Sequence, residues 1–138
     1  MKALRILLLA LAATAVQAQE FTSKDADAIR AVITAQINAF RVDDGDKAFA
    51  LATPGIRAQF GGAAAFLAMV KAEYPVVYRP KSVIFERPGT LDGGIVQPVR
   101  FTDAEGRGWT AIYPMERQPG GDWRINGCYL ERVAGRET

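Results

Sequence analysis

The chain has 138 residues, of which 17 are basic, 15 are acidic and none is histidine, and hydrophobic residues make up 49%. This length allows one ordinary domain, and its interspersed charges exclude the concentrated basic patch that nucleic-acid binding requires. The lack of histidine excludes His-assisted serine or cysteine nucleophiles and most catalytic zinc sites.

The first 18 residues have the pattern of a secretory signal peptide. Lys2 and Arg5 are basic, residues 6–16 form an apolar run broken only by Thr14, and small residues lead to Ala18. The run is shorter than the roughly 20 residues that a membrane-crossing helix needs. We therefore expect cleavage after Ala18, export, and one domain over residues 19–138 with no membrane attachment. Lys2 and Arg5 also account for the formal charge of +2, so this domain is neutral.

The first half of the chain predicts helices. Apolar residues recur every three or four positions over residues 25–41, and Thr22 and Ser23 precede them as helix caps. The acidic residues at 43, 44 and 46 fit capping and turn chemistry, although paired carboxylates also share protons or hold cations. Three shorter helical segments follow: one around Ala48, one over residues 54–59, and one over residues 63–73 that stops at Pro75.

The second half predicts an antiparallel sheet. Four runs rich in β-branched and aromatic residues are joined by short glycine-bearing turns typical of hairpins. Pro98 and Pro114 interrupt two runs, and we expect a bulge, a bend or an edge at each. Helices followed by this meander predict an α+β fold, with N-terminal helices packed on a curved four-stranded sheet. The runs are residues 81–87, 95–103, 109–117 and 123–132.

The last run indicates a sheet that is apolar on both faces. Strict alternation places Trp123, Ile125 and Tyr129 on one face, and Cys128 and Leu130 on the other. A single layer of helices covers only one face. We therefore expect the second face to contact a partner chain or to curl around a pocket.

Three strings of residues resemble a known family when taken together. They are residues 36–40 (Gln-Ile-Asn-Ala-Phe), residues 66–75, and the closing residues 121–130 (Gly-Asp-Trp-Arg-Ile-Asn-Gly-Cys-Tyr-Leu). Over residues 29–130 the chain resembles the bacterial exported family called domain of unknown function 4864. This resemblance implies a Gram-negative periplasmic location.

That family is similar to the nuclear transport factor 2-like superfamily, whose cystatin-like cone is a curved antiparallel sheet wrapped over helices. The superfamily holds ketosteroid isomerases, dehydratases, polyketide cyclases and non-enzymatic binding or dimerisation domains, so the fold does not settle the function. The resemblance implies no catalytic residues for this chain. It also lacks the histidine of the dehydratase-like members, and the aspartate–tyrosine–aspartate set of the isomerases is not placed in it.

Two aromatic residues and one arginine are candidate ligand contacts. Trp109 and Tyr113 share one face of the third run, where they line a pocket with one phenol donor or form a plain core face. Arg100 binds an anionic ligand or pairs with Glu86 across strands.

The last run adds Asn126 and Cys128, which flank Gly127. A glycine inside a strand marks a bulge or a close approach, so this pair presents an amide and a thiol to a ligand, or serves packing alone. Cys128 is the only cysteine, and it therefore forms no disulfide within the chain.

We therefore expect a non-enzymatic exported domain that uses no cofactor or metal. It binds a small apolar molecule or an envelope protein, and it forms a homodimer. The alternative is a cofactor-free lyase or isomerase that uses a carboxylate and Tyr113 inside the cone. A third interpretation is a structural subunit of an envelope complex.

Overall fold

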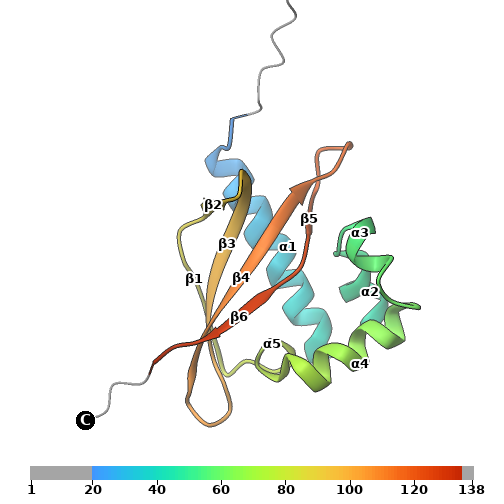
Figure 1. The fold of residues 1–138 in the computed structure, drawn as a ribbon, viewed down its shortest axis with the longest axis vertical. Coiled ribbons are helices and arrows are strands. Elements are labelled where there is room, and N and C mark those ends of the chain that lie inside the picture. Colours follow the sequence, from blue (N-terminus) through green and yellow to red (C-terminus); the bar gives the residue numbers. More distant parts are fainter. Residues whose placement is uncertain (1–19, 135–138) are drawn as a thin grey trace, which may run out of the picture.

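The computed structural model describes residues 20–134, so the expected signal peptide lies outside the described residues. Helices come first in the chain and strands follow (Figure 1). The helices are α1 (Ser23–Arg41), α2 (Gly45–Ala50), α3 (Pro54–Arg57), α4 (Ala63–Glu73) and α5 (Pro75–Tyr78). The strands are β1 (Ser82–Phe85), β2 (Gly89–Leu91), β3 (Gly94–Thr102), β4 (Gly108–Arg117), β5 (Trp123–Ile125) and β6 (Tyr129–Arg132).

Helix α1 begins two residues before the expected start, because Thr22 and Asp25 form a capping box. The Thr22 side chain accepts from the Asp25 amide, and the Asp25 carboxylate accepts from the Thr22 amide. One stripe of α1 is buried against the sheet, with Ile29 and Ile33 fully enclosed. This stripe confirms the predicted amphipathic helix.

The other helices follow local capping signals. Asp44 caps α2 by accepting from the Lys47 amide, and Thr53 caps α3 by accepting from the Ile56 amide. Helix α4 occupies the predicted range, but α5 was not expected. Pro75 ends one helix and begins the next, because the first turn of a helix needs no amide donor from that position. None of the described helices is both long and apolar enough to cross a membrane.

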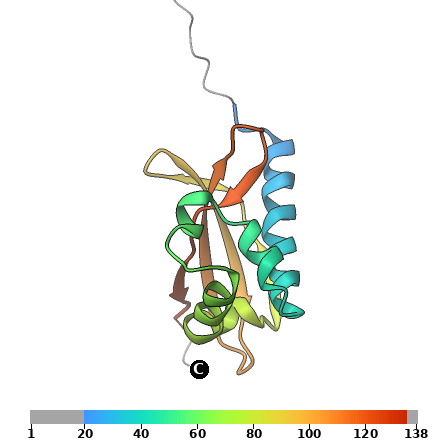
Figure 2. The same cartoon turned by 90° about the vertical axis from the view of Figure 1, so that its right-hand side faces the viewer.

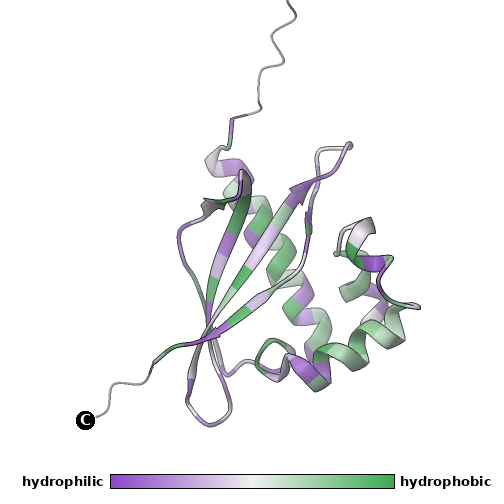
Figure 3. Cartoon of the chain, viewed as in Figure 1, coloured by the Kyte–Doolittle hydropathy of each residue, from purple (hydrophilic) through white to green (hydrophobic). Residues whose placement is uncertain are grey.

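All pairings between the strands of the sheet are antiparallel, which confirms the α+β fold class, although the sheet has six strands where four were expected. Its order is β1-β3-β4-β5, with β2 beside the other half of β3 and β6 beside the other half of β4. Figure 2 shows α1 lying along one face of this curved sheet, and Figure 1 shows α2, α3 and α4 beside the sheet. We call the helix-covered side the inner face. Figure 3 shows hydrophobic residues gathered along α1, α4 and the central strands, where the core lies.

Pro98 and Pro114 lie inside the two central strands, beside the points where the outer strands are interrupted. The Pro98 carbonyl accepts from the Glu86 amide at 3.1 Å, and the Pro114 carbonyl accepts from the Asn126 amide at 2.8 Å. The nitrogen and the carbonyl of a residue in an antiparallel strand point towards the same neighbouring strand. The proline nitrogens, which have no hydrogen to donate, therefore face the points where the outer strands are interrupted. The expected irregularities at the prolines are therefore breaks in the neighbouring strands.

The prediction of one continuous strand over residues 123–132 is wrong. The chain leaves the ladder at residues 126–128, where Gly127 has a φ of +116°. Ile125 lies opposite Met115 and Leu130 lies opposite Ala111, so this segment holds one residue more than the facing part of β4. The extra residue has the effect of a β-bulge and reverses the alternation of side chains.

This reversal corrects the prediction about the two faces of the sheet. Cys128 and Leu130 lie on the inner face together with Trp123 and Ile125, and Tyr129 lies on the outer face. Most apolar residues of the last run therefore share the inner face, and Tyr129 is the exception. The outer face still carries exposed apolar side chains, because Ile84, Leu91 and Tyr129 are 59%, 51% and 64% exposed.

Candidate functional site

A cavity of about 310 Å³ lies between the helices and the inner face, at the break between β5 and β6. Helices α1, α3, α4 and α5, together with the loop residues beside the helices, supply most of its wall, and β4, β5 and residues 126–129 supply the rest. The wall is mainly apolar and rich in aromatic rings. Its aromatic members are Phe40, Phe60, Phe66, Tyr74, Tyr113 and Tyr129.

Tyr113 is the central polar residue of this cavity. Its side chain is 1% exposed, and its hydroxyl is buried with no hydrogen-bond partner among the described residues. An unpaired buried hydroxyl costs about 1–3 kcal/mol, so native proteins rarely retain one without a reason. A molecule in the cavity would meet this hydroxyl together with the side-chain amides of Gln36, Gln59 and Asn126, which also line the wall.

The Cys128 thiol lies beside the Tyr113 hydroxyl and interacts with it, although this contact does not have the geometry of a full hydrogen bond. Burial raises the pKa of the Cys128 thiol to about 12, and the neighbouring Tyr113 hydroxyl lowers it only slightly against that effect. Burial also raises the pKa of Tyr113 well above its usual value, and Cys128 raises it further. Both groups are therefore protonated and uncharged at neutral pH.

Asn126 is held at the rim of the cavity by a contact between α3 and the strand break. The Thr53 hydroxyl donates to the Asn126 side-chain oxygen at 2.8 Å, and the Thr53 amide donates to the Ile125 carbonyl at 2.9 Å. Thr53 therefore both caps α3 and ties it to the sheet. This contact closes one side of the cavity wall.

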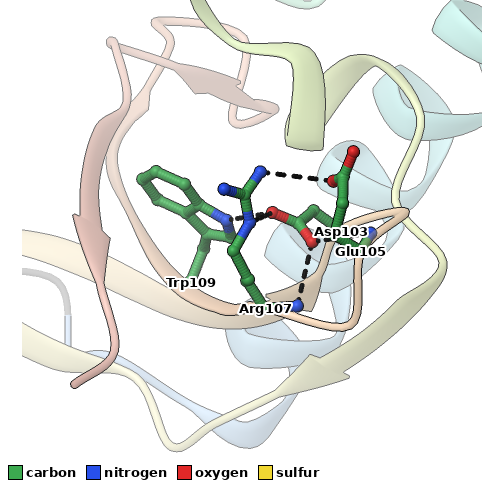
Figure 4. Close-up of polar contacts among 4 residues, drawn as sticks. All are labelled: Asp103, Glu105, Arg107 and Trp109. Atoms are coloured by element: carbon green, nitrogen blue, oxygen red, sulfur yellow. Dashed lines mark hydrogen bonds and ion pairs between the residues drawn. The ribbon is translucent and has the colours of Figure 1, made fainter. Parts of the chain in front are cut away.

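Trp109 belongs to a different hollow, a cleft of about 740 Å³ between α5, β6 and the turn that joins β3 to β4. Its indole donates to Asp103 at 2.9 Å, and Asp103 also accepts from the Arg107 side chain and from the amides of Glu105 and Arg107 (Figure 4). Burial by itself would raise the pKa of Asp103, but the bonds from Trp109 and Arg107 outweigh it and lower this pKa to about 2. Trp109 is thus held in one orientation.

Arg100 lies on the outer face, away from both hollows. Its side chain is 52% exposed and pairs with Glu86 at 3.5 Å, as in the charge-pair interpretation. Of the five candidate residues, the structure brings Tyr113, Asn126 and Cys128 together at one cavity. Trp109 and Cys128 meet at the neighbouring cleft.

The chain matches the family model described as Domain of unknown function (DUF4864) over residues 22–138. It belongs to this family. No curated protein and no solved structure gives a significant match. The similarity of the DUF4864 domain to the nuclear transport factor 2-like superfamily therefore remains a resemblance, while its α+β architecture is established by the structure.

The sequence did not identify the helical half of the DUF4864 cavity. Phe40, Phe60, Phe66 and Tyr74 come from helices or the residues that follow them, and a core stripe has the same pattern as a cavity wall. Among the described residues, no group of histidine, cysteine and carboxylate side chains could hold a metal ion.

Proposed function

We propose that this protein binds a small, uncharged, mainly apolar molecule in the cavity between its helices and its sheet. The unpartnered Tyr113 hydroxyl, buried in an apolar wall, is the observation that carries the proposal. Ligand sites are typically apolar hollows of a few hundred Å³ in which few polar groups fix the orientation. The cavity, at about 310 Å³, is of this size.

The chemistry of the wall indicates which kind of molecule fits. Tyr113 is protonated, so it offers a donor to a ligand carbonyl, ether or hydroxyl oxygen. The described lining contains no charged side chain, and a charged ligand would lose its hydration without compensation. The aromatic rings of Phe40, Phe60, Phe66, Tyr74 and Tyr113 favour a flat or aromatic body.

The alternative, a cofactor-free lyase or isomerase, needs a carboxylate beside Tyr113. No aspartate or glutamate is among the described residues that line the cavity. The raised pKa values of Tyr113 and Cys128 also keep both groups protonated at neutral pH, so neither is available as a general base. The geometry therefore favours binding over acid–base catalysis.

A pair of shape-matched probes tests the proposal. We expect 2-acetylnaphthalene to bind more tightly than 2-ethylnaphthalene, because only the ketone accepts a hydrogen bond from Tyr113. Tyr113→Phe removes the hydroxyl. It should weaken binding of the ketone about fivefold, as expected for one neutral hydrogen bond, and leave binding of the hydrocarbon unaffected. Ligand-observed NMR titration measures both affinities.

Tyr78→Phe is the matched control, because the Tyr78 hydroxyl bonds to Asp43 on the surface and Tyr78 does not line this cavity. It should change neither affinity. Failure of both probes to bind the unaltered protein would contradict the proposal.

We further propose that the protein is exported and works in the periplasm. The signal-peptide pattern of residues 1–18 supports this. Protein recovered from a periplasmic fraction should begin at Gln19, as read by N-terminal sequencing. Native mass spectrometry of the same sample would detect a retained small molecule, and a cytoplasmic chain that keeps Met1 would contradict export.

A further inference from the structure

The cleft beside β6 adjoins a sheet edge that no described strand covers. β6 pairs with β4 on one side only. The edge of β5, in contrast, is covered by residues 51–53, where Ala52 forms a bridge with Ile125. The sheet is therefore closed at β5 and open at β6.

The register determines which backbone groups of β6 point outward. The Val133 amide donates to the Gly108 carbonyl at 2.9 Å, so the backbone N–H and C=O groups of residues 129, 131 and 133 face β4. The amides and carbonyls of Leu130 and Arg132 consequently face away from the sheet. The Cys128 carbonyl faces the same way and accepts from the Tyr74 hydroxyl at 3.5 Å, which places the end of α4 beside this edge.

The cleft along this edge offers side chains held in place by their neighbours. Trp109 is fixed by its bond to Asp103, and the Arg132 guanidinium stacks 5.8 Å from the centre of its ring. Val76 and Leu130 add apolar surface. A segment that paired with β6 would place its alternate side chains against these groups.

The charged side chains that line the cleft are paired within the protein except for Glu73, and Arg132 beside them lies over the Trp109 ring with no ion pair among the described residues. Arg107 pairs with Asp103 and Glu105, and Arg79, the other arginine of the lining, pairs with Asp43. Glu73 also lines the cleft, and the described residues provide no ion pair for it. Its charge is therefore available to a basic group of a partner.

We propose that the edge of β6 and its cleft bind an extended polypeptide segment, in which apolar residues alternate with basic ones, by β-strand addition. The backbone of the segment pairs with Leu130 and Arg132, its apolar side chains contact Trp109, and a basic side chain pairs with Glu73. This site does not require a ligand in the cavity, so the two proposals fail independently.

Amide hydrogen exchange followed by NMR tests the proposal directly. The purified protein is titrated with a short blocked peptide of alternating valine and lysine. The amides of Leu130 and Arg132 should become protected, while the Glu131 amide, which already faces β4, changes little. Binding of the peptide without protection at Leu130 and Arg132, or no binding at all, would overturn the proposal.

Two controls make the test specific. Peptides N-methylated on one or the other set of alternate amides have the same composition, and only the isomer whose β6-facing amides are blocked should lose binding. Glu73→Lys should weaken binding of the peptide about fivefold, which is the upper range for an exposed charge pair. Glu116→Lys, on the exposed outer face, should leave the affinity unchanged. Equal binding of the parent peptide and both methylated isomers would refute strand addition.

Discussion

At the scale of single residues, two buried polar groups differ in how they are satisfied. Asp103 accepts four hydrogen bonds from its own turn and from Trp109, whereas the Tyr113 hydroxyl accepts and donates none to the described residues. A satisfied carboxylate serves the structure, because any change in its partners leaves a buried charge uncompensated. An unsatisfied hydroxyl in an apolar cavity has no such structural role, and this contrast separates the binding residue from the scaffold.

The pKa of Asp103 makes stability depend on pH in a defined window. Its pKa is about 2 in the folded protein, below the usual 3.8, so its stabilisation is complete above pH 4 and is lost as the pH falls towards 2. Asp103→Asn should lower the urea concentration at the midpoint of unfolding at pH 7. Between pH 4 and pH 2 this midpoint should fall less steeply than in the unaltered protein. Tryptophan fluorescence during urea unfolding at several pH values measures both effects.

Part of the acid dependence should survive in this variant. Asp25, which bonds to Thr22, Arg117 and Trp123, also has a pKa of about 2. An acid dependence that is unchanged in Asp103→Asn would show that the bonds to Asp103 do not contribute to stability.

At the scale of elements, the break between β5 and β6 forms the site. The extra residue near Gly127 turns Cys128 towards the helices, and Thr53 ties α3 to the same break. The cavity lies where the ladder is interrupted, because a continuous strand would keep strict alternation and place Cys128 on the outer face.

Gly127→Ala tests this role of the break. A φ of +116° is strained for any residue with a Cβ, so the variant should lose about 2 kcal/mol of unfolding free energy and bind the naphthyl ketone more weakly. Gly61→Ala is the control, because its Cβ meets no atom within 4 Å and its φ is not positive. Urea unfolding and NMR titration compare the two variants. Equal stability of both would contradict the strain.

At the scale of the molecule, one layer of helices covers one face of the sheet and leaves the other exposed. Ile84, Leu91 and Tyr129 lie on that outer face. These exposed apolar side chains are the ones through which the homodimer proposed from the sequence would form.

Ile84→Lys and Leu91→Lys should shift a dimer to monomers, because each places a charge in the proposed contact. Sedimentation equilibrium of the variants and of the unaltered protein measures the change. Val42→Lys is the control, as Val42 is equally apolar and 74% exposed but follows α1, away from the sheet. A monomeric unaltered protein would end the proposal.

Local patterns in the sequence were sufficient for helices α1 to α4, for strands β1, β3 and β4, and for the α+β class. Caps such as Thr22 and Thr53, apolar spacing in α1, and glycine-rich turns act over a few residues, so they are visible without the fold. Tyr113, Asn126 and Cys128 were also identified as candidates, from aromatic and glycine positions in two strands. Each of these signals is carried by residues close together in the chain.

Only the tertiary structure decided which residues share a face and a cavity. The parity change at Gly127 depends on pairing with β4, so alternation alone misplaced Cys128 and Leu130. Phe40, Phe66 and Tyr74 reach the cavity from helices far away in the sequence, and Arg100 is turned away from it by the register of β3. Short-range chemistry determines the elements, whereas long-range pairing and packing determine the site that they enclose.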